Sequence, residues 1–394
     1  ELDDGYTLTC VAYPRDSFTI ETGEAPRVFG KLDEKGIPVD FEKFDEMAAE
    51  AESAIEAALA DWNFKNFKQL KSSVEEKLKA DPNHPITEAG HPVMEATVLS
   101  RRQERIMYVY TWMNSTRRQA SNFRKLAKQA RKNGGRLYPE HRVRDDLGRV
   151  YVANFNYTNL PKTARPAVLP EKGQELWSLD IDGAELMALA HISRDKKLLA
   201  DLKPKDLPTH SAALDLGKLP EDVTEAEREV YKRRNFSIIY GASATYLSRD
   251  LGRSEKEAQE MIDGFKRNYP TAGHFIDKTY EEGMRHGRSK TALGTERRFK
   301  LTQDVGKSCI SHAIQSTAGE LARAAIPVAD EAVEATGIDG SLLMSVFDSY
   351  VCSLPKGLTK QEVARYIKEP LERFFKDNGF EMSLEIKYHG PHWS

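Results

Sequence analysis

Four residues at a regular interval of four suggest a binding site along one predicted helix. Within the stretch REVYKRRNFSIIYG this interval separates Arg228, Lys232, Phe236 and Tyr240. Steps of four on an α-helix drift by about 40° each, so the four side chains spread over roughly 120° of one face. Two cations followed by two aromatic rings suit a ligand with a polyanionic end and a flat end, such as a nucleoside triphosphate. The alternative is a helix with two solvated cations and two half-buried rings, and this stretch alone favours that alternative.

Two aspartates stand where predicted strands reach the surface. Asp180 follows the apolar stretch WSL, and Asp348 lies with Ser349 in the turn of the predicted strand pair SLLMSVFDSYVCSLP. A strand-end Asp is most often a helix cap or a turn residue, and Asp180 alone would be interpreted in that way. Two of them on one sheet suit Mg²⁺, which prefers oxygen ligands and is held by one or two carboxylates plus substrate phosphates. A two-ion site stabilises the attacking and leaving oxygens of a phosphoryl displacement.

Composition places the chain among globular proteins. Its 394 residues suffice for two or three domains, and 40% apolar with 30% charged residues argues against disorder. Apolar runs stay below 18 residues, so we expect no membrane partner.

The first residues, ELDDGYTLTC, lack an initiator Met and a signal pattern, so we expect a cut from a longer protein or an engineered start. Three cysteines without metal or disulfide spacing suit a reducing cytoplasm.

A basic excess is confined to residues 101–150, although the whole chain has a net charge of −3. This segment has 14 Lys and Arg against four Asp and Glu. Such a local excess is typical of a site for a nucleic-acid backbone. A solvated helix face is the common alternative for a charge run, but such a face rarely needs charges of nearly one sign.

Secondary-structure patterns change several times along the chain. Residues 1–22 contain a strand-like piece that looks like the edge of something missing. The rest is expected to be helical at 40–134, strand-like at 148–161 and 175–181, helical at 183–287, and strand-like at 341–355. A helical arm followed by sheet, helices and sheet predicts an α+β multi-domain enzyme in which distant segments complete one sheet.

Taken together, these motifs resemble family A DNA polymerases, the group of bacterial DNA polymerase I and its phage relatives. SLDIDGAELMALAHIS is similar to the first palm motif, REVYKRRNFSIIYG to the fingers motif, and FDS at 347–349 to the second palm motif. Further similar stretches are KLDEKGIPVDFEKF, WNFKNFKQL, GRVYVANFNYTNLP, LPTHSAALDLG, HAIQSTAGELARAA and GPHW. The resemblance implies a right-hand polymerase architecture with an antiparallel-sheet palm, helical fingers and a helical thumb.

The resemblance also implies how the chain divides into subdomains. The expected stretches are a remnant preceding the thumb at 1–27, the thumb at 28–135, the first part of the palm at 136–200, the fingers at 201–300, and the second part of the palm at 301–394.

The implied activity is template-directed addition of dNTPs to the 3′-hydroxyl of a primer. Two Mg²⁺ ions, for which Mn²⁺ can substitute, would be held by Asp180, Asp348 and the backbone carbonyl of Ile181. Lys232 would be the catalytic general acid for the leaving pyrophosphate. The implied substrate-binding residues are Arg228, Phe236, Tyr240, Glu185 and His210. The implied contacts to primer–template DNA are Arg149, Asn156, Asn159, Lys307 and Gln315.

The second palm motif departs from the family pattern. Phe347-Asp348-Ser349 stands where the family has His-Asp-Glu, so the histidine and an auxiliary carboxylate are missing. The Asp-Ser pair is more similar to single-subunit RNA polymerases, whereas Glu185 favours DNA synthesis because those enzymes have Gly there. A single-subunit RNA polymerase or a sugar-relaxed polymerase stays an alternative, as does a non-catalytic module that binds primer–template DNA.

Partners and origin follow from the same comparison. Too few residues precede the predicted thumb at residue 28 to form a proofreading exonuclease. An exonuclease, helicase or primase domain would therefore lie upstream, and a processivity factor would be a separate partner. The departures suggest a phage-borne or plasmid-borne member that works in the cytoplasm of its bacterial host.

Overall fold

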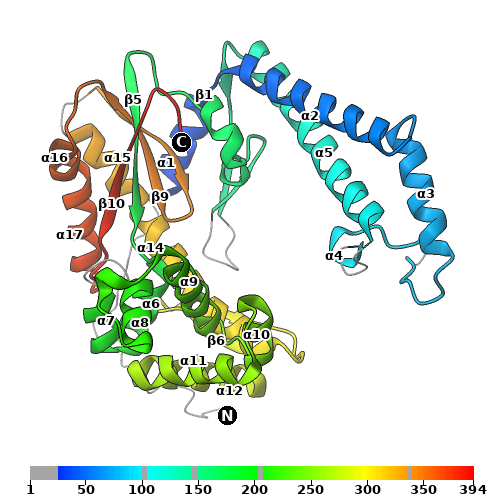
Figure 1. Ribbon diagram of the computed structural model, residues 1–394. Helices are drawn as coiled ribbons and strands as arrows, with labels where there is room; N and C mark the ends of the chain where they lie inside the picture. Colours follow the sequence, from blue (N-terminus) through cyan, green and yellow to red (C-terminus); the bar gives the residue numbers. More distant parts are fainter. Residues whose placement is uncertain (1–24, 88, 100–103, 144–149, 203–206, 336–338) are drawn as a thin grey trace, which may run out of the picture. The chain divides into compact units, whose positions relative to one another are not determined.

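The computed structural model describes residues 25–394 apart from 88, 100–103, 144–149, 203–206 and 336–338 (Figure 1). The strand expected within residues 1–22 lies outside the described residues. Two compact units make up the chain. The sheet unit contains Pro139–Thr158, Lys172–Gly390 and the N-terminal segment to Lys35, and the arm unit contains Gly36–Tyr138, Asn159–Glu171 and Pro391–Ser394.

A four-stranded antiparallel sheet is the centre of the sheet unit, with the strand order β10-β5-β9-β8. Its strands are β5 (Gln174–Ile181), β8 (Ser341–Val346), β9 (Ser349–Pro355) and β10 (Leu384–Gly390). The strands predicted around 175–181 and 341–355 are confirmed, and so is the completion of one sheet by distant segments. The prediction that Ser349 lies in the turn is wrong. Ser349 begins β9 and pairs with Val346 and Asp180, so the turn consists of Phe347 and Asp348 alone.

Helices cover one face of this sheet through apolar side chains. Leu179 and Ile181 of β5 and Leu384 of β10 share one core cluster with buried residues of the surrounding helices. The helices of this unit are α1 (Ala25–Lys35), α6 (Ala184–Ser193), α7 (Lys196–Leu202), α8 (Leu207–Leu216), α9 (Glu225–Ile239), α10 (Ala244–Leu251), α11 (Glu255–Asn268), α12 (Pro270–His286), α13 (Val305–Ser311), α14 (Thr317–Ala324), α15 (Ile326–Ala335), α16 (Lys360–Val363) and α17 (Glu369–Asp377). The helices expected over 183–287 are thus confirmed in the described residues.

Two short hairpins complete the sheet unit: β3 (Glu140–Val143) with β4 (Val150–Ala153), and β6 (Arg288–Lys290) with β7 (Glu296–Arg298). The first is anchored by His141, whose Nε2 lies 2.6 Å from the Tyr157 hydroxyl and whose ring stacks on Phe29 with centroids 4.9 Å apart. Burial lowers the pKa of His141, although Asp33 beside its Nδ1 opposes this shift.

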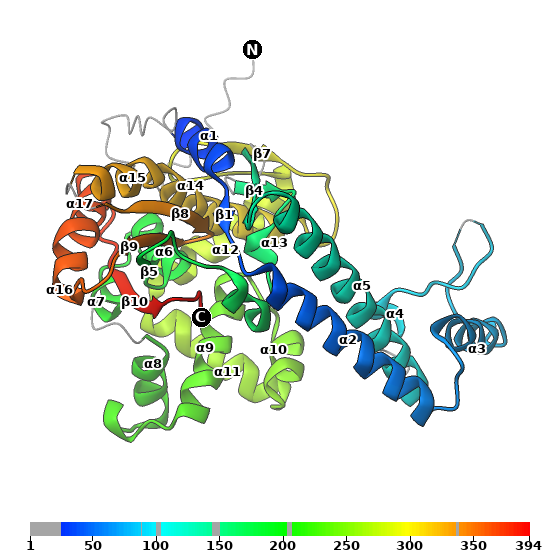
Figure 2. The ribbon, with the colours of Figure 1, turned by 90° about the horizontal axis from the view of Figure 1, so that it is seen from above.

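The arm unit consists mainly of long helices, as the sequence predicts for residues 40–134. Its elements are β1 (Ile37–Pro38), α2 (Phe41–Asp61), α3 (Phe67–Lys79), α4 (Ala96–Leu99), α5 (Arg105–Lys132) and β2 (Arg136–Leu137). Helices α2 and α5 lie side by side in Figures 1 and 2. Arg124 of α5 donates to Asp45 at 3.1 Å and to Glu52 at 2.7 Å on α2. Hydrogen bonds from Arg131 and then Arg124 hold the pKa of Asp45 below its usual range, and the hydrogen bond from Arg124 does the same for Glu52.

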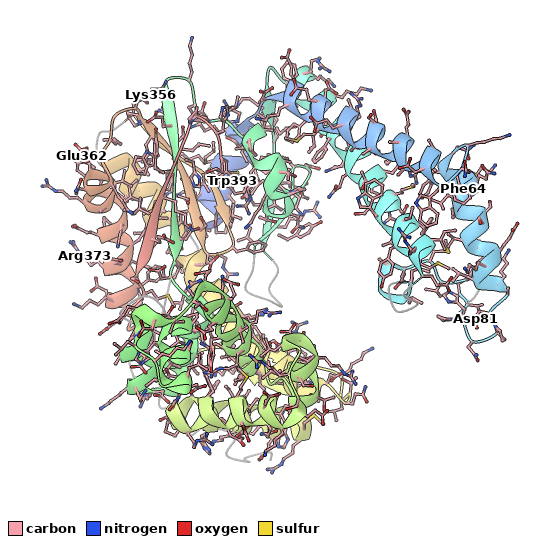
Figure 3. All side chains as sticks on the ribbon, viewed as in Figure 1. Phe64, Asp81, Lys356, Glu362, Arg373 and Trp393 are labelled. Carbon is pink, nitrogen blue, oxygen red and sulfur yellow. The ribbon has the colours of Figure 1, made fainter. Side chains whose placement is uncertain are left out.

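The chain's C-terminal segment returns to the arm unit. Trp393, labelled in Figure 3, is 3% exposed, and its backbone N–H donates to Val168 at 3.1 Å. The Arg165 guanidinium lies over the Trp393 ring at 4.4 Å from the centroid. The GPHW stretch thus completes the packing of this unit. No helix among the described residues has the length and apolar character needed to cross a bilayer.

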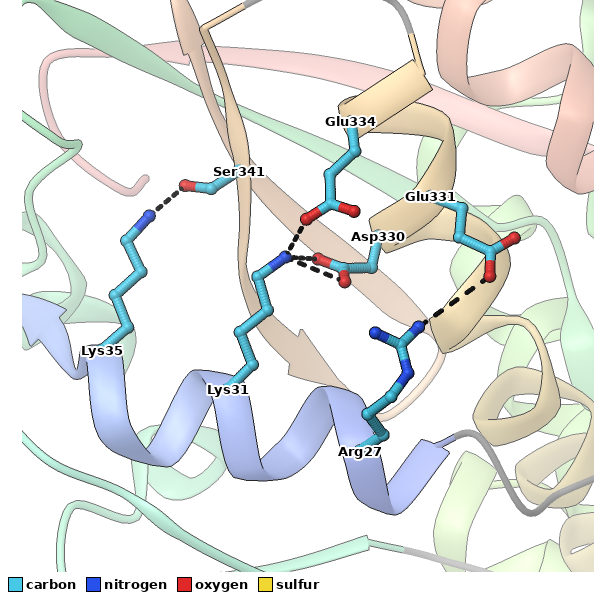
Figure 4. A network of polar contacts seen from close by, with 7 residues as sticks. All are labelled: Arg27, Lys31, Lys35, Asp330, Glu331, Glu334 and Ser341. Atoms are coloured by element: carbon cyan, nitrogen blue, oxygen red, sulfur yellow. Dashed lines mark hydrogen bonds and ion pairs between the residues drawn. The ribbon is translucent and has the colours of Figure 1, made fainter.

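Charged side chains connect α1 to α15 and β8 (Figure 4). The Lys31 ammonium donates to both carboxylate oxygens of Asp330, at 2.9 and 3.0 Å, and also to Glu334. The Asp330 side chain is 1% exposed, so Lys31 compensates a charge that has left water. One turn later, Lys35 donates to the Ser341 hydroxyl at 2.8 Å. Helix α1 is therefore part of the sheet unit rather than a loose extension.

We expect Lys31→Met to destabilise the sheet unit by about 1–3 kcal/mol, because it leaves the Asp330 carboxylate buried without its cation. The control is Arg27→Met on the same helix, since the 3.9 Å pair of Arg27 with Glu331 is exposed on both sides and should matter by less than about 0.5 kcal/mol. Urea unfolding followed by circular dichroism measures both. Equal losses in the two variants would contradict this role of Lys31.

Candidate active site

A cavity of about 410 Å³ in the sheet unit brings together side chains from five separate segments. Its lining includes Glu185 at the start of α6, Phe236 of α9, Gln315 and Asp348. These four predicted site residues are far apart in the sequence. The other lining residues are Val150, Gly183, Ala184, Ala318, Gly319, Ala322, Arg323, Ile326, Ser345 and Phe347. The lining combines an apolar wall with a few convergent polar groups, which is typical of a ligand site.

Asp180 and Asp348 are brought together by the pairing of β5 with β9. Asp180 stands opposite Ser349, and the backbone N–H of Ile181 donates to the Asp348 carbonyl at 3.0 Å. The two-residue turn forces Phe347 into the left-handed region at φ +58°, which is uncommon for a residue with a side chain. Phe347 is consequently 54% exposed beside Asp348 at the cavity.

Only one carboxylate oxygen of Asp180 has partners among the described residues. Oδ2 lies 3.1 Å from Lys387 Nζ and 3.4 Å from the Ser178 hydroxyl. Lys387 Nζ also lies 3.4 Å from Glu385. Burial lowers the pKa of Lys387, but the hydrogen bond and charge of Asp180 outweigh this, so the pKa is raised overall. Sequence reasoning missed Lys387, although its alternation with Glu385 along the last strand places both on one face.

The residues present fit a divalent cation. Asp180 and Asp348, with the Ile181 carbonyl, would supply oxygen donors of the kind that Mg²⁺ prefers, and strand pairing brings their backbones together. Asp180 Oδ1 remains available because only Oδ2 is engaged. The described residues contain no group of three His, Cys, Asp or Glu arranged around one ion. Mg²⁺ does not require such a group when substrate phosphates and water complete its shell.

Helix α9 carries Arg228, Lys232 and Phe236 as predicted, and Tyr240 follows directly as its C-cap. The helix begins with a capping box in which Thr224 accepts from the backbone N–H of Glu227 at 3.3 Å. Acidic side chains that the sequence analysis had not considered accompany the cations. Arg228 pairs with Glu225 at 3.2 Å and with Glu229 at 3.4 Å, and Lys232 lies 3.8 Å from Glu229. Exposed pairs of this kind are weak, so a polyanion can replace them.

The opposite side of α9 is held by Arg234, which sequence reasoning missed. Arg234 is fully buried, pairs with Asp215 of α8, and lies over the Tyr231 ring at 4.6 Å from the centroid. Burial lowers the pKa of this guanidinium, and Asp215 opposes the shift. The spacing of buried Tyr231, Arg234 and Ile238 is the only sequence signal that could have placed Arg234 inward.

The end of α9 approaches α13 closely at Gly241. This glycine has φ +71°, and a Cβ there would lie 2.9 Å from Ile310 and 3.8 Å from Lys307. A side chain at this position would be strained by the positive φ and would require the end of the Ile310 side chain to move. The contact fixes Tyr240 near the helix that carries Lys307, whose ammonium lies 3.7 Å from Asp304.

Gln315 lies in a π-helical turn, His312–Ser316, between α13 and α14. It is the only residue of this turn that is not buried, and it faces the cavity. His312 fixes the turn through a 2.6 Å hydrogen bond between its Nδ1 and the Ser289 hydroxyl. Burial, assisted by Arg297, lowers the pKa of His312 to about 4. Since the unfolded chain would take up this proton near pH 6.5, the stabilisation by neutral His312 is lost as pH falls from 6.5 toward 4.

The remaining predicted residues lie outside the cavity lining. His210 Nε2 is 3.3 Å from Asp201. Asn156 accepts from the Thr158 hydroxyl at 2.6 Å, and Asn159 is exposed in the arm unit. Arg149 lies outside the described residues.

The cations of α5 differ in their partners, and Arg117 lies over the Phe67 ring at 4.7 Å from the centroid. Arg124 and Arg131 pair with acids of α2. A basic stripe on the same helix has no acidic partner among the described residues, and it consists of the exposed side chains Arg118, Lys125, Lys128 and Lys132. Their spacing places them within roughly 80° of one helix face. The unneutralised charge that the sequence predicted is thus concentrated on this stripe.

Comparison with known proteins agrees with this architecture. Residues 40–394 match the family described as DNA polymerase family A. DNA polymerase I of Aquifex aeolicus is 29% identical over 377 residues, which are 91% of this chain and 63% of that protein. The thermostable DNA polymerase I of Thermus aquaticus is 30% identical over 254 residues, which are 60% of this chain and 30% of that protein.

A solved structure supports the fold. The POL domain of Pol1 from M. smegmatis, in complex with DNA primer-template and dNTP, superposes with a TM-score of 0.76 at 19% identity and covers 94% of this chain and 69% of that chain. The match over residues 40–394 shows that the chain belongs to DNA polymerase family A. The expected family and the α+β polymerase fold are thereby confirmed. These relatives are bacterial, and the phage or plasmid origin stays a prediction.

We expect Asp215→Ala to cost about 3–5 kcal/mol of stability, because it leaves the buried Arg234 guanidinium without its counter-ion. Asp222→Ala, an exposed acid between α8 and α9, is the matched control and should change stability by less than about 0.5 kcal/mol. Urea unfolding measures the loss in free energy of unfolding. Amide hydrogen exchange shows whether α9 opens before the rest of the sheet unit. Protection of α9 that is equal in the two variants would exclude Arg234 as its anchor.

Proposed function

We propose that the chain catalyses template-directed addition of dNTPs to a primer 3′-hydroxyl. The observation on which this proposal rests is the cavity lined by Asp348, Glu185, Phe236 and Gln315. Asp180 lies near the end of the strand that pairs beside Asp348. Support also comes from the related Pol1 domain, whose structure holds a primer–template and a dNTP. The chain spans 63% of the Aquifex aeolicus relative, so the activities of whole polymerases beyond this reaction are not assigned to it.

The reacting end of the nucleotide would lie between the two aspartates and α9. Asp180, Asp348 and the Ile181 carbonyl would hold Mg²⁺, or Mn²⁺ in its place, and the bound ions would supply stabilisation of the charge that develops on the phosphate oxygens. Arg228 and Lys232 would exchange their weak pairs with Glu225 and Glu229 for the β- and γ-phosphates. His210 would add a phosphate contact.

Lys232 is the proposed general acid. Its side chain is 48% exposed, and it lies at the middle of α9, between Arg228 and Phe236. From that position it can donate a proton to the leaving pyrophosphate. Phe236 would lie against the sugar and base, since it lines the cavity, and Tyr240 would stack near the template base.

Glu185 would decide the choice of sugar. It lies in the first turn of α6, where it is only partly buried, and it lines the cavity. In this position its side chain would fill the space that a 2′-hydroxyl requires. The geometry therefore favours deoxyribonucleotides over the RNA polymerase alternative.

Each unit carries some of the predicted contacts to primer–template DNA. Gln315 and Lys307, with Arg149, would donate to minor-groove acceptors, which occupy similar positions in every correct base pair. Asn156 and Asn159 would grip the template and primer, and the basic stripe of α5 would contact phosphates in a salt-dependent manner. We propose the thumb at 28–135, the palm at 136–200 and 301–394, and the fingers at 201–300, with residues 1–27 as a remnant. An exonuclease, helicase or primase domain and a processivity factor stay predicted partners.

Asp180→Ala and Asp348→Ala should each lower the rate of primer extension by a thousandfold or more, on the order of 4 kcal/mol of barrier, because each removes a metal ligand. Primer–template affinity should change less than about threefold, since the phosphate-binding cations remain. Single-turnover extension gives the rate, and fluorescence anisotropy gives the affinity. A variant that keeps more than a tenth of the rate would refute the metal assignment.

Glu185→Ala should raise the kcat/KM for ribonucleotides relative to deoxyribonucleotides by roughly tenfold or more, because it opens space for the 2′-hydroxyl. Glu185→Gln has nearly the same size and serves as the control. Its ratio should remain near the wild-type value if bulk rather than charge excludes the hydroxyl. Ratios that are unchanged in both variants would mean that Glu185 is only an acid at a helix N-terminus.

A further inference from the structure

Lys387 lies against the candidate metal ligand Asp180 and has no role in the function proposed above. Its ammonium is 3.1 Å from Asp180 Oδ2 and 3.4 Å from Glu385 Oε2. Strand pairing explains this arrangement, because Glu385 is opposite Asp180 and Lys387 is opposite Ser178. Residues that are two apart on a strand share a face, so all three charged groups lie on the same side of the sheet.

Uncharged serines stand next to Asp180 on this face, and His389 follows beyond Ser178, with its Nε2 2.9 Å from the Ser178 hydroxyl. Ser349 stands opposite Asp180 on β9, and Ser178 donates to the same carboxylate oxygen at 3.4 Å. Lys387 is thus the cation that balances Asp180 and Glu385 within this group. A divalent ion bound to Asp180 would lie about 2.1 Å from a carboxylate oxygen, close to the lysine ammonium. Two cations would then share one carboxylate, each at its own oxygen, and repel each other.

Building on the proposed function, we propose that Lys387 is a built-in counter-ion for the metal site. Its ammonium holds Asp180 when no divalent ion is bound and moves to Glu385 when one is. The movement is short because both carboxylates already contact the ammonium. Lys387 is therefore a positioning residue that weakens metal binding in the absence of DNA and nucleotide and keeps Asp180 in place for the ion.

Glu385 is the second part of this device. It gives the lysine an alternative partner, so it lowers the free energy needed to separate Lys387 from Asp180. Removal of Lys387 and removal of Glu385 should consequently act in opposite directions on metal affinity. A purely structural ion pair between β5 and β10 would not produce such opposite effects, because either removal would merely loosen the strand pair.

The test is Mn²⁺ binding to the full chain without DNA or nucleotide, measured from the electron paramagnetic resonance signal of free Mn²⁺. Lys387→Met should bind Mn²⁺ about tenfold more tightly than wild type, since an ammonium near the ion is removed. Glu385→Gln should bind it several-fold more weakly, and Lys387→Arg, which keeps the charge, should stay near wild type. Lys256→Met removes an exposed lysine paired with Glu260 at 4.0 Å and is the control that should change nothing.

A double-mutant cycle makes the assignment specific. If Glu385 acts through Lys387, Glu385→Gln should have a clearly smaller effect in the Lys387→Met background. Equal Mn²⁺ affinity of Lys387→Met and wild type, or weaker binding by Lys387→Met, would overturn the inference. Asp180→Asn separates the two hypotheses. Loss of Mn²⁺ binding in this variant keeps the metal site of the proposed function even if Lys387 has no effect, whereas unchanged binding would refute that metal site itself.

Discussion

The pairing of β5 with β9 is the interaction on which the candidate site depends. Asp180 stands opposite Ser349, and the Ile181 N–H donates to the Asp348 carbonyl at 3.0 Å. A shift of the register by one residue would turn Asp180 to the opposite face of the sheet, among the apolar side chains that face the helices. The buried strands β8 and β9 prevent such a shift, because their apolar side chains fit the core in one register only. Hydrophobic packing of the sheet thereby determines where two carboxylates meet.

Helix α9 shows a similar division between packing and chemistry. Its inward side carries Arg234, which is fully buried and compensated by Asp215, together with Tyr231 and Ile238. Its other side presents Lys232 and Phe236 with partial exposure. A buried guanidinium is costly unless it is paired, so its position is strictly defined and orients the rest of the helix. The face with the potential phosphate contacts is rigid because the opposite face is fixed.

Charge in the site is balanced by neighbours rather than by solvent. Arg228 and Lys232 have Glu225 and Glu229 beside them, and Asp180 has Lys387. Each of these pairs is partly exposed and therefore weak enough to be exchanged for a ligand of the same charge. The protein thus holds the charges of the candidate site in place without burying them.

Sequence alone determined the helical spacing of Arg228, Lys232 and Phe236, the strand that carries Asp180, the strand pair whose turn carries Asp348, and the family. These features depend on local periodicity and on contiguous motifs. Tertiary structure decided the positions of three residues that no local pattern predicts. Ser349 is a strand residue and not a turn residue, because the two-residue turn of Phe347 and Asp348, with Phe347 at positive φ, suffices to reverse β8 into β9. Arg234 faces inward, since its partner is on another helix, and Lys387 reaches Asp180 only through strand pairing across more than 200 residues. Such contacts arise from packing between distant segments, and a single sequence does not specify that packing.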